Sequence, residues 1–188
     1  MKQTVRDVEL KGKRVLIRVD VNVPLDEAAG RITDDTRIRE SLSTIRYCLE
    51  QGASVVLMSH LGRPNGQRVP SLSLRPVAER LGELLGRPVV FIEECAGPGV
   101  ESRVRALKAG ELALLENLRF EPQEERNDPA FAKQLSRLGE LYVNDAFGTA
   151  HRAHASTEGV AHHLPAIAGL LMEKEIRYLD GALREPVR

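Results

Sequence analysis

Short apolar runs alternate with longer segments of helical periodicity along the whole chain. An interior strand of a parallel sheet is typically a short apolar run, whereas a helix repeats its apolar positions every three or four residues. The runs that predict strands cover residues 14–20, 53–59, 88–92, 112–117, 141–147 and 165–170. The segments that predict helices cover residues 34–52, 73–86, 99–110, 128–139 and 171–183. This alternation predicts parallel strands joined by helical crossovers.

The first predicted helix shows the pattern most clearly. Its apolar face is formed by Ile38, Leu42, Ile45 and Leu49. Asp34 or Asp35 is suited to cap its N-terminus, and Gly52 is suited to end it. With six such strands, the pattern predicts an α/β fold: a Rossmann-like three-layer domain whose six-stranded parallel sheet is flanked by helices on both faces.

Polar side chains interrupt the first strand, in the stretch "RVDVNVP" from Arg18 to Pro24. Successive side chains of a strand point to opposite faces, so Arg18, Asp20 and Asn22 share the face opposite to a row of valines. An interior strand should be apolar on both faces, so this polar row needs another explanation.

Similar polar stretches follow three other predicted strands. The second strand runs into "SHLGRP", the fourth into "ENLRF" and the fifth into "NDAFGTAHRAH". Ligands of open α/β sheets bind beyond the carboxyl ends of the strands. The four polar exits therefore predict one concave polar site, and we expect Asp20 and Asn22 to face into it.

Arginines dominate these exits. Arg63, Arg119 and Arg152 follow three different strands, and Arg37 begins the first helix beside the same edge. Guanidinium groups that converge on a small volume repel one another unless an anion lies between them. The arginines therefore favour a phosphorylated or carboxylated small molecule as the ligand.

The remaining polar groups could complete such a site. Asp20 and Asn22 would bind hydroxyl groups of the ligand, and His60 could donate a hydrogen bond to the anion. Each residue also has a structural explanation when taken alone. An arginine can be a solvated surface side chain, Asp20 and Asn22 can cap a turn before Pro24, and His60 can be a satisfied loop histidine.

A metal site is a competing interpretation. His151 and His154 lie near Asp145 in the sequence, and histidine with carboxylate is a common set of metal ligands. Arg152 lies between the two histidines and would oppose a cation, and no HExxH motif occurs. We therefore expect no metal in this chain, although a metal-dependent hydrolase built on these three residues remains an alternative.

Composition excludes several classes of partner. The chain has 188 residues, with 27 Lys and Arg against 27 Asp and Glu, so it has no net charge to attract nucleic acid or membranes. It contains neither a GxxxxGK[ST] nor a GxGxxG nucleotide motif. The two cysteines, Cys48 and Cys95, suit a reducing compartment, and no apolar run reaches membrane-spanning length. We expect a cytoplasmic protein.

Four motifs together resemble the phosphoglycerate kinase family: "RVDVNVP", "SHLGRP", "LLENLRF" and "YVNDAFGTAHRAHASTEG". Their order and spacing fit as well, and the resemblance extends from about Lys13 onward. It implies a glycolytic enzyme that transfers a phosphoryl group reversibly between ATP and the carboxylate of 3-phosphoglycerate, giving 1,3-bisphosphoglycerate. Proteins of this family have two domains, of which the N-terminal one binds the phosphoglycerate and the C-terminal one binds the Mg-nucleotide.

The resemblance also implies roles for single residues. Asp20 and Asn22 would bind the hydroxyl region of the substrate. Arg37 would contact its carboxylate and act as the catalytic residue, because it stabilises charge on the transferring phosphoryl group. The distal phosphate would be held by His60, Arg63, Arg119 and Arg152.

By the same resemblance, residues 1–172 are the N-terminal 3-phosphoglycerate-binding domain, and residues 173–188 begin the interdomain helix and hinge. The nucleotide-binding domain, and with it the site for Mg-ATP or Mg-ADP, is expected outside this chain. We expect the chain alone to be a monomer that binds 3-phosphoglycerate weakly, does not turn over and holds no cofactor. The alternative is a non-catalytic anion-binding domain.

Overall fold

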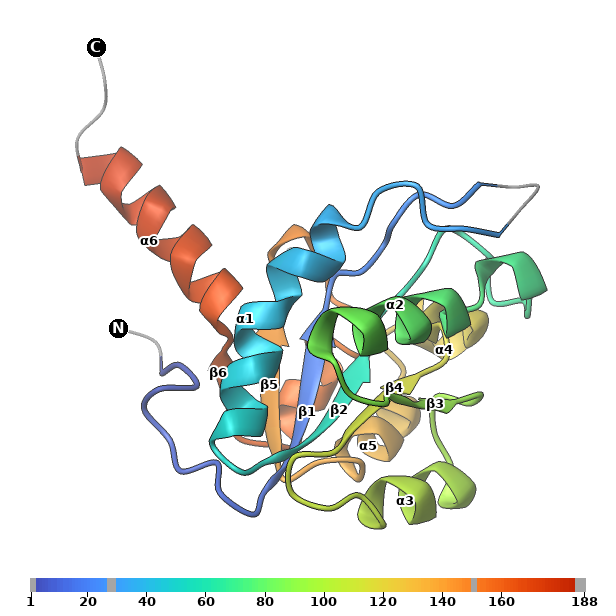
Figure 1. Cartoon of the computed structure of the whole chain (residues 1–188), viewed down its shortest axis with the longest axis horizontal. Coiled ribbons are helices and arrows are strands. Elements are labelled where there is room, and N and C mark those ends of the chain that lie inside the picture. The colour runs from blue at the N-terminus through green and yellow to red at the C-terminus, as the bar shows by residue number, and fades with distance from the viewer. Residues whose placement is uncertain (1–2, 27–29, 150–151, 185–188) are drawn as a thin grey trace.

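The computed structural model describes residues 3–26, 30–149 and 152–184. A six-stranded sheet lies at its centre, in the order β3-β4-β2-β1-β5-β6, and every neighbouring pair of strands is parallel (Figure 1). The strands are β1 (Arg14–Val19), β2 (Ser54–Met58), β3 (Val90–Ile92), β4 (Leu112–Leu115), β5 (Leu141–Asp145) and β6 (Ala166–Ala168). Each corresponds to one of the six predicted runs, although most strands end earlier than the run does.

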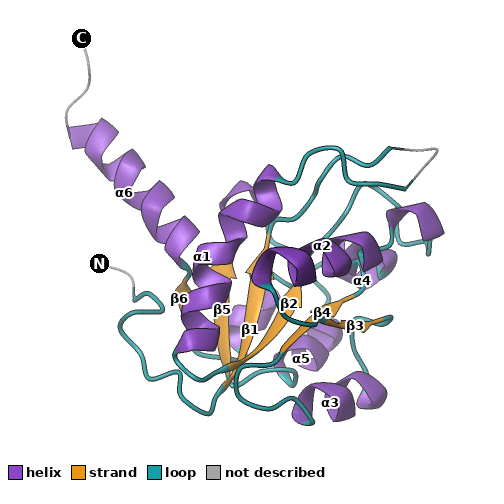
Figure 2. Ribbon diagram, in the orientation of Figure 1, coloured by secondary structure: helices purple, strands orange, loops and turns teal. Residues whose placement is uncertain are grey.

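Helices cover both faces of the sheet (Figure 2). The α-helices are α1 (Thr36–Glu50), α2 (Arg75–Leu85), α3 (Pro98–Arg105), α4 (Pro122–Glu125), α5 (Pro129–Ser136) and α6 (Leu170–Arg184). The described residues also form four short 3-10 helices, η1 (Pro70–Leu72), η2 (Leu118–Phe120), η3 (Phe147–Thr149) and η4 (Gly159–His162). All five predicted helices are present, whereas α4 and the 3-10 helices are too short to show a periodic pattern.

Two hydrophobic cores separate the three layers. On one face of the sheet α1 and α2 pack Ile38, Ile45 and Leu81 against strand residues such as Ile17. On the opposite face α3, α5 and η4 pack their own apolar residues against residues such as Leu16. The prediction of a three-layer α/β domain with helices on both faces is confirmed.

The polar row of the first strand is divided between two environments. β1 ends at Val19, so Asp20 and Asn22 belong to the loop beyond the carboxyl end of the strand. Arg18 lies within the strand, where it is only 1% exposed. Burial still alternates beyond the strand: Val21 and Val23 stay in the same core as Val19, whereas Asp20 and Asn22 are only partly buried, as the predicted alternation requires.

The ends of two predicted helices differ in detail. Asp35 occupies the N-cap position of α1, but its carboxylate pairs with Arg39 and Arg80. The neighbouring Asp34 accepts a hydrogen bond of 2.9 Å from the Thr36 amide. The helix predicted over residues 99–110 ends at Arg105. Its last predicted residues instead form a turn before β4, in which Gly110 adopts a φ of +82°.

Helix α6 begins in the core and extends away from the rest of the molecule (Figure 1). At its start, Asp145 Oδ1 accepts hydrogen bonds from the amides of Leu171 (3.0 Å) and Met172 (3.2 Å). Farther along, Tyr178 is 74% exposed. The domain boundary expected between residues 172 and 173 therefore falls inside this helix. Among the described residues, no helix combines the length and apolar character needed to cross a membrane.

Candidate functional site

A pocket of about 210 Å³ opens at the edge of the sheet where the parallel strands end. Its lining residues come from the loops after β1 and β2, from the first turn of α1, from η2 after β4, and from the segment after β5. They are Asp20, Asn22, Arg37, His60, Gly62, Arg63, Arg119, Gly148, Thr149 and Arg152. The structure thus brings all seven predicted site residues together, as expected for polar side chains at the carboxyl ends of parallel strands.

The loop after β1 is held in place by its own polar side chains. Asp20 Oδ1 accepts a hydrogen bond of 3.2 Å from the Asn22 amide, and Asp20 Oδ2 accepts one of 2.7 Å from Arg37 Nη1. Asn22 Oδ1 accepts a hydrogen bond of 2.9 Å from the Gly62 amide. Asp20 therefore orients Arg37 at the pocket rim, and Asn22 joins the loops after β1 and β2.

The loop after β2 requires a glycine at position 62. Gly62 has a φ of +63°, and a Cβ atom there would lie 2.9 Å from Leu72 Cδ2. Its carbonyl oxygen accepts a hydrogen bond of 2.8 Å from Arg119 Nη1. The backbone of this loop therefore helps to aim the Arg119 guanidinium group.

Asn117 fixes the position of the loops around Arg119. It is fully buried, and its amide nitrogen donates hydrogen bonds to the carbonyl oxygens of Leu61 (2.7 Å) and Leu72 (2.9 Å). Its Oδ1 accepts hydrogen bonds from the amides of Leu61 (3.2 Å) and Arg119 (3.1 Å). One side chain thus ties together the segments that carry His60 and Arg119.

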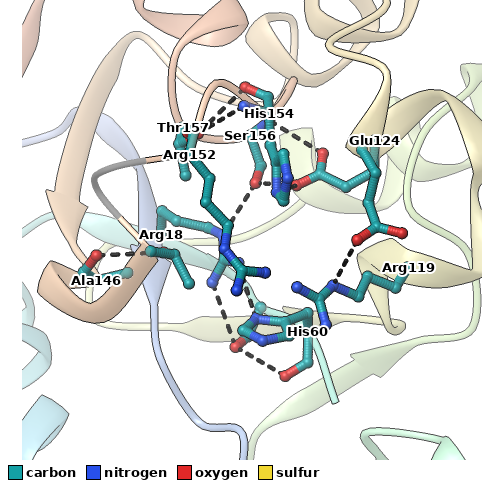
Figure 3. Close-up of polar contacts among 12 residues, drawn as sticks. Arg18, His60, Arg119, Glu124, Ala146, Arg152, His154, Ser156 and Thr157 are labelled. Atoms are coloured by element: carbon teal, nitrogen blue, oxygen red, sulfur yellow. Dashed lines mark hydrogen bonds and ion pairs between the residues drawn. The ribbon is translucent and has the colours of Figure 1, made fainter. Parts of the chain in front are cut away.

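The electrostatics of the pocket are strongly positive. The side chains of Arg119, Arg152 and His60 point toward one another (Figure 3). Arg119 is 5% exposed, and its pKa is lowered by burial and by the nearby charges of Arg152 and Arg63, against the opposing effect of Glu125. Because this positive charge is concentrated in a small volume, an anion in the pocket would be stabilised.

His60 stays neutral in these surroundings. Burial is the main cause that lowers its pKa to about 2, and the positive charges of Arg18, Arg119 and Arg152 lower it further. The ring therefore contributes a hydrogen-bonding group to the pocket without contributing a charge at neutral pH.

Three buried residues lie behind the pocket and were not predicted to belong to the site: Arg18, Ser156 and Glu124. Arg18 lies 3.0 Å from His60 through its Nη2 atom, and its Nε donates to Ser156 Oγ at 2.9 Å. Ser156 in turn donates to Glu124. The one available signal was an arginine next to the end of a strand whose interior is apolar, because a buried charge needs a partner.

The side chains considered as metal ligands do not form a metal site in the described part of the chain. Asp145 is buried and its Oδ1 caps α6, whereas His154 lies beside Glu124 at 4.0 Å. His151 lies outside the described residues. Among the residues that are described, no group of three His, Cys, Asp or Glu side chains is suited to hold a metal ion.

Comparisons with known proteins point to one family. The family model described as phosphoglycerate kinase matches residues 5–188. A phosphoglycerate kinase from Chloroflexus aurantiacus is 63% identical over 189 residues, which is 100% of this chain and 47% of the relative. This chain therefore spans about half the length of that curated relative.

Solved structures agree with the sequence comparison. Phosphoglycerate kinase from Coxiella burnetii superposes with a TM-score of 0.88 at 39% identity, covering 100% of this chain and 46% of the other. The enzyme from Pyrococcus horikoshii OT3 superposes with a TM-score of 0.89 at 38% identity, covering 100% of this chain and 47% of the other. Both the sequence and the fold lead to the same conclusion: this chain belongs to the phosphoglycerate kinase family.

Proposed function

We propose that this chain supplies the 3-phosphoglycerate site of a phosphoglycerate kinase. The reaction would be the reversible glycolytic conversion of ATP and 3-phosphoglycerate to ADP and 1,3-bisphosphoglycerate. Membership of the family and the polar pocket at the end of the sheet together support this proposal.

The observation that carries the proposal is the imbalance of charge in the pocket. Its lining contains four arginines, Arg37, Arg63, Arg119 and Arg152, but one carboxylate, Asp20. The pocket is also smaller than the roughly 300 Å³ at which sites for drug-sized ligands begin. A small molecule with more than one negative charge, such as a phosphorylated three-carbon acid, satisfies both conditions.

The proposed roles of the single residues are those that the resemblance to the family implies. His60, Arg63, Arg119 and Arg152 would hold the phosphate of the substrate. Asp20 and Asn22 would bind its hydroxyl region. Arg37 would contact the carboxylate that accepts the new phosphoryl group. Asp20 already holds the half-exposed Arg37 side chain at the pocket rim, where it can reach a second reactant.

The chemistry asked of these residues is mainly positioning and charge stabilisation. A phosphoryl group in transfer is metaphosphate-like, so the protein needs no covalent intermediate. Arg37 would be the catalytic residue of this half, because its positive charge would stabilise the negative charge on the transferring group.

The nucleotide is proposed to bind outside this chain. The pocket's lining is cationic and does not suit Mg²⁺, so Mg-ATP or Mg-ADP would be held by the further part of the protein that the longer relatives possess. Residues 1–172 would then form the substrate domain, and residues 173–188 would lead toward the hinge. A cytoplasmic monomer remains part of the proposal, and the two buried free cysteines support a reducing location.

Isothermal titration of the chain with 3-phosphoglycerate tests the proposal. We expect weak, saturable binding, and we expect Arg119→Gln or Arg152→Gln to weaken it by about 10- to 100-fold, since hydrogen bonds to charged groups contribute about 1.5–3 kcal/mol. The control is Arg137→Gln, which removes an exposed arginine that pairs with Glu101 away from the pocket.

Two further ligands distinguish the alternatives. Glycerate, which lacks the phosphate, should bind much more weakly than 3-phosphoglycerate. Equal affinity for 3-phosphoglycerate and inorganic sulfate would instead favour a non-catalytic anion-binding domain. We also expect no ATP-dependent phosphoryl transfer by the purified chain alone, and measurable turnover would refute this.

A further inference from the structure

Four polar side chains form a continuous buried line from the core to the pocket wall. They are Glu124, Ser156, Arg18 and His60, and each is at most 5% exposed. They come from α4, the loop before η4, the C-terminal end of β1 and the loop after β2. Of the four, His60 is the residue that lines the pocket.

Hydrogen bonds connect the four residues in order (Figure 3). Arg18 contacts His60 Nδ1 through Nη2 at 3.0 Å and Ser156 Oγ through Nε at 2.9 Å. Ser156 Oγ contacts Glu124 Oε1, and the Ser156 amide donates to Glu124 Oε2 at 3.0 Å. The line therefore has a carboxylate at one end and an imidazole at the other.

The direction of every hydrogen bond in the line is set by Arg18. A guanidinium group carries donors and no acceptor, so Ser156 Oγ must accept from it, and the single Ser156 proton must then go to Glu124. For the same reason His60 Nδ1 must accept and carries no proton. A neutral imidazole has one N–H, and that proton is left on Nε2.

Glu124 also balances the charge of Arg18. Burial raises the pKa of Glu124 above its usual value, and Arg18 and the two hydrogen bonds from Ser156 partly oppose this rise. A buried charge with no opposite charge nearby would be costly, so the Glu124 carboxyl group, linked to Arg18 through Ser156, helps to keep Arg18 in place. The orientation of Arg18 therefore depends on Glu124 and Ser156 together.

We propose that Glu124, Ser156 and Arg18 are positioning residues that hold His60 as the Nε2–H tautomer and direct this N–H toward an anion in the pocket. The identity of that anion, the phosphate of 3-phosphoglycerate, rests on the proposed function. The tautomer itself is a property of the free chain and can be measured without any ligand.

The imidazole nitrogens of the ¹⁵N-labelled free chain provide the test. We expect His60 to show an unprotonated Nδ1 and a protonated Nε2 at every pH from 5.5 to 8. The double variant Arg18→Met with Glu124→Gln removes both buried charges together. In it we expect a mixture of both tautomers and about tenfold weaker binding of 3-phosphoglycerate, equivalent to about 1.4 kcal/mol.

Ser156→Ala is a milder variant that removes only the bridging hydroxyl group. In it we expect a detectable population of the Nδ1–H tautomer. The control is Glu158→Gln, a change to an exposed carboxylate that pairs with His162, which should leave the spectrum of His60 unchanged. Dispersed amide spectra would show that each variant is folded.

A protonated Nδ1 in the free wild-type chain would overturn the inference. A single Nε2–H tautomer that persists in folded Ser156→Ala, and in the double variant if that folds, would also overturn it. If the tautomer behaves as expected but 3-phosphoglycerate does not bind, the positioning of His60 stands and the proposed function fails.

Discussion

His60 shows how strongly a single side chain can be altered by its surroundings. An unperturbed histidine titrates near pH 6.5. Burial and the adjacent arginines lower the pKa of His60 to about 2, so the folded chain excludes a proton that the unfolded chain takes up readily. The histidine that best serves the proposed anion site is therefore also a source of acid instability.

This shift predicts how stability depends on pH. Between pH 6.5 and pH 2 the unfolded state binds a proton at His60 that the folded state does not, so the free energy of unfolding falls as the pH falls. The slope from this residue is up to about 1.4 kcal/mol per pH unit. Urea denaturation between pH 7 and pH 5 measures it.

The matched variants are His60→Asn, which keeps an acceptor for Arg18 but does not titrate, and His163→Asn at an exposed position. We expect His60→Asn to flatten the pH dependence and His163→Asn to retain it. Equal slopes in the wild type and His60→Asn would contradict the assignment of this effect to His60.

At the scale of the elements, the site depends on short irregular segments that are fixed by buried polar side chains. Asn117 joins η1, η2 and the loop after β2, and Asp145 joins the end of β5 to the start of α6. The backbone groups that these two side chains bind have no partner in a regular helix or strand, so the positions of these segments depend on such hydrogen bonds.

Replacement of Asn117 by alanine should disturb the pocket as well as the fold. It would leave the buried backbone groups of Leu61 and the partly buried carbonyl group of Leu72 without their partners. We expect a loss of about 2–4 kcal/mol in the free energy of unfolding. We also expect weaker 3-phosphoglycerate binding at temperatures where the variant remains folded. Unchanged binding would show that Asn117 does not position Arg119.

Asp145 gives a corresponding prediction for α6. Asp145→Ala removes the acceptor of the Leu171 and Met172 amides, whereas Asp145→Asn keeps an acceptor oxygen in the same place. We expect the alanine variant to lose about 1–3 kcal/mol of stability and the asparagine variant to lose less. Amide hydrogen exchange at Leu171 and Met172 should become faster in Asp145→Ala, and unchanged exchange would contradict this role.

At the scale of the whole molecule, the sequence was sufficient to predict the architecture. All six strands were found because each is a short apolar run, and the meeting of Asp20, His60, Arg119 and Arg152 followed from the parallel arrangement. Arg18 and Ser156 contact each other across 138 positions of sequence, and Glu124 lies in a four-residue helix. No local pattern specifies such contacts, so the buried line behind His60 could be seen only in the structure.

The balanced overall charge of the chain also explains why the proposed attraction for anions must be local. The chain carries 27 basic and 27 acidic side chains, so its overall charge provides no long-range field. We expect the affinity for 3-phosphoglycerate to fall as salt rises, because pocket charges open to solvent are screened. Titrations at two ionic strengths would show this, and an affinity independent of salt would contradict a binding site based on arginines.

The most direct test of the central proposal is an NMR titration of the ¹⁵N-labelled chain with 3-phosphoglycerate. We predict saturable chemical-shift changes of the backbone amides at the pocket, those of Asn22, Gly62, Arg63, Arg119 and Thr149. The amides of α3 and α5, which pack on one face of the sheet, should change little. Shifts that are absent at millimolar ligand, or confined to surfaces away from this pocket, would contradict the proposal that this chain contains a preformed 3-phosphoglycerate site.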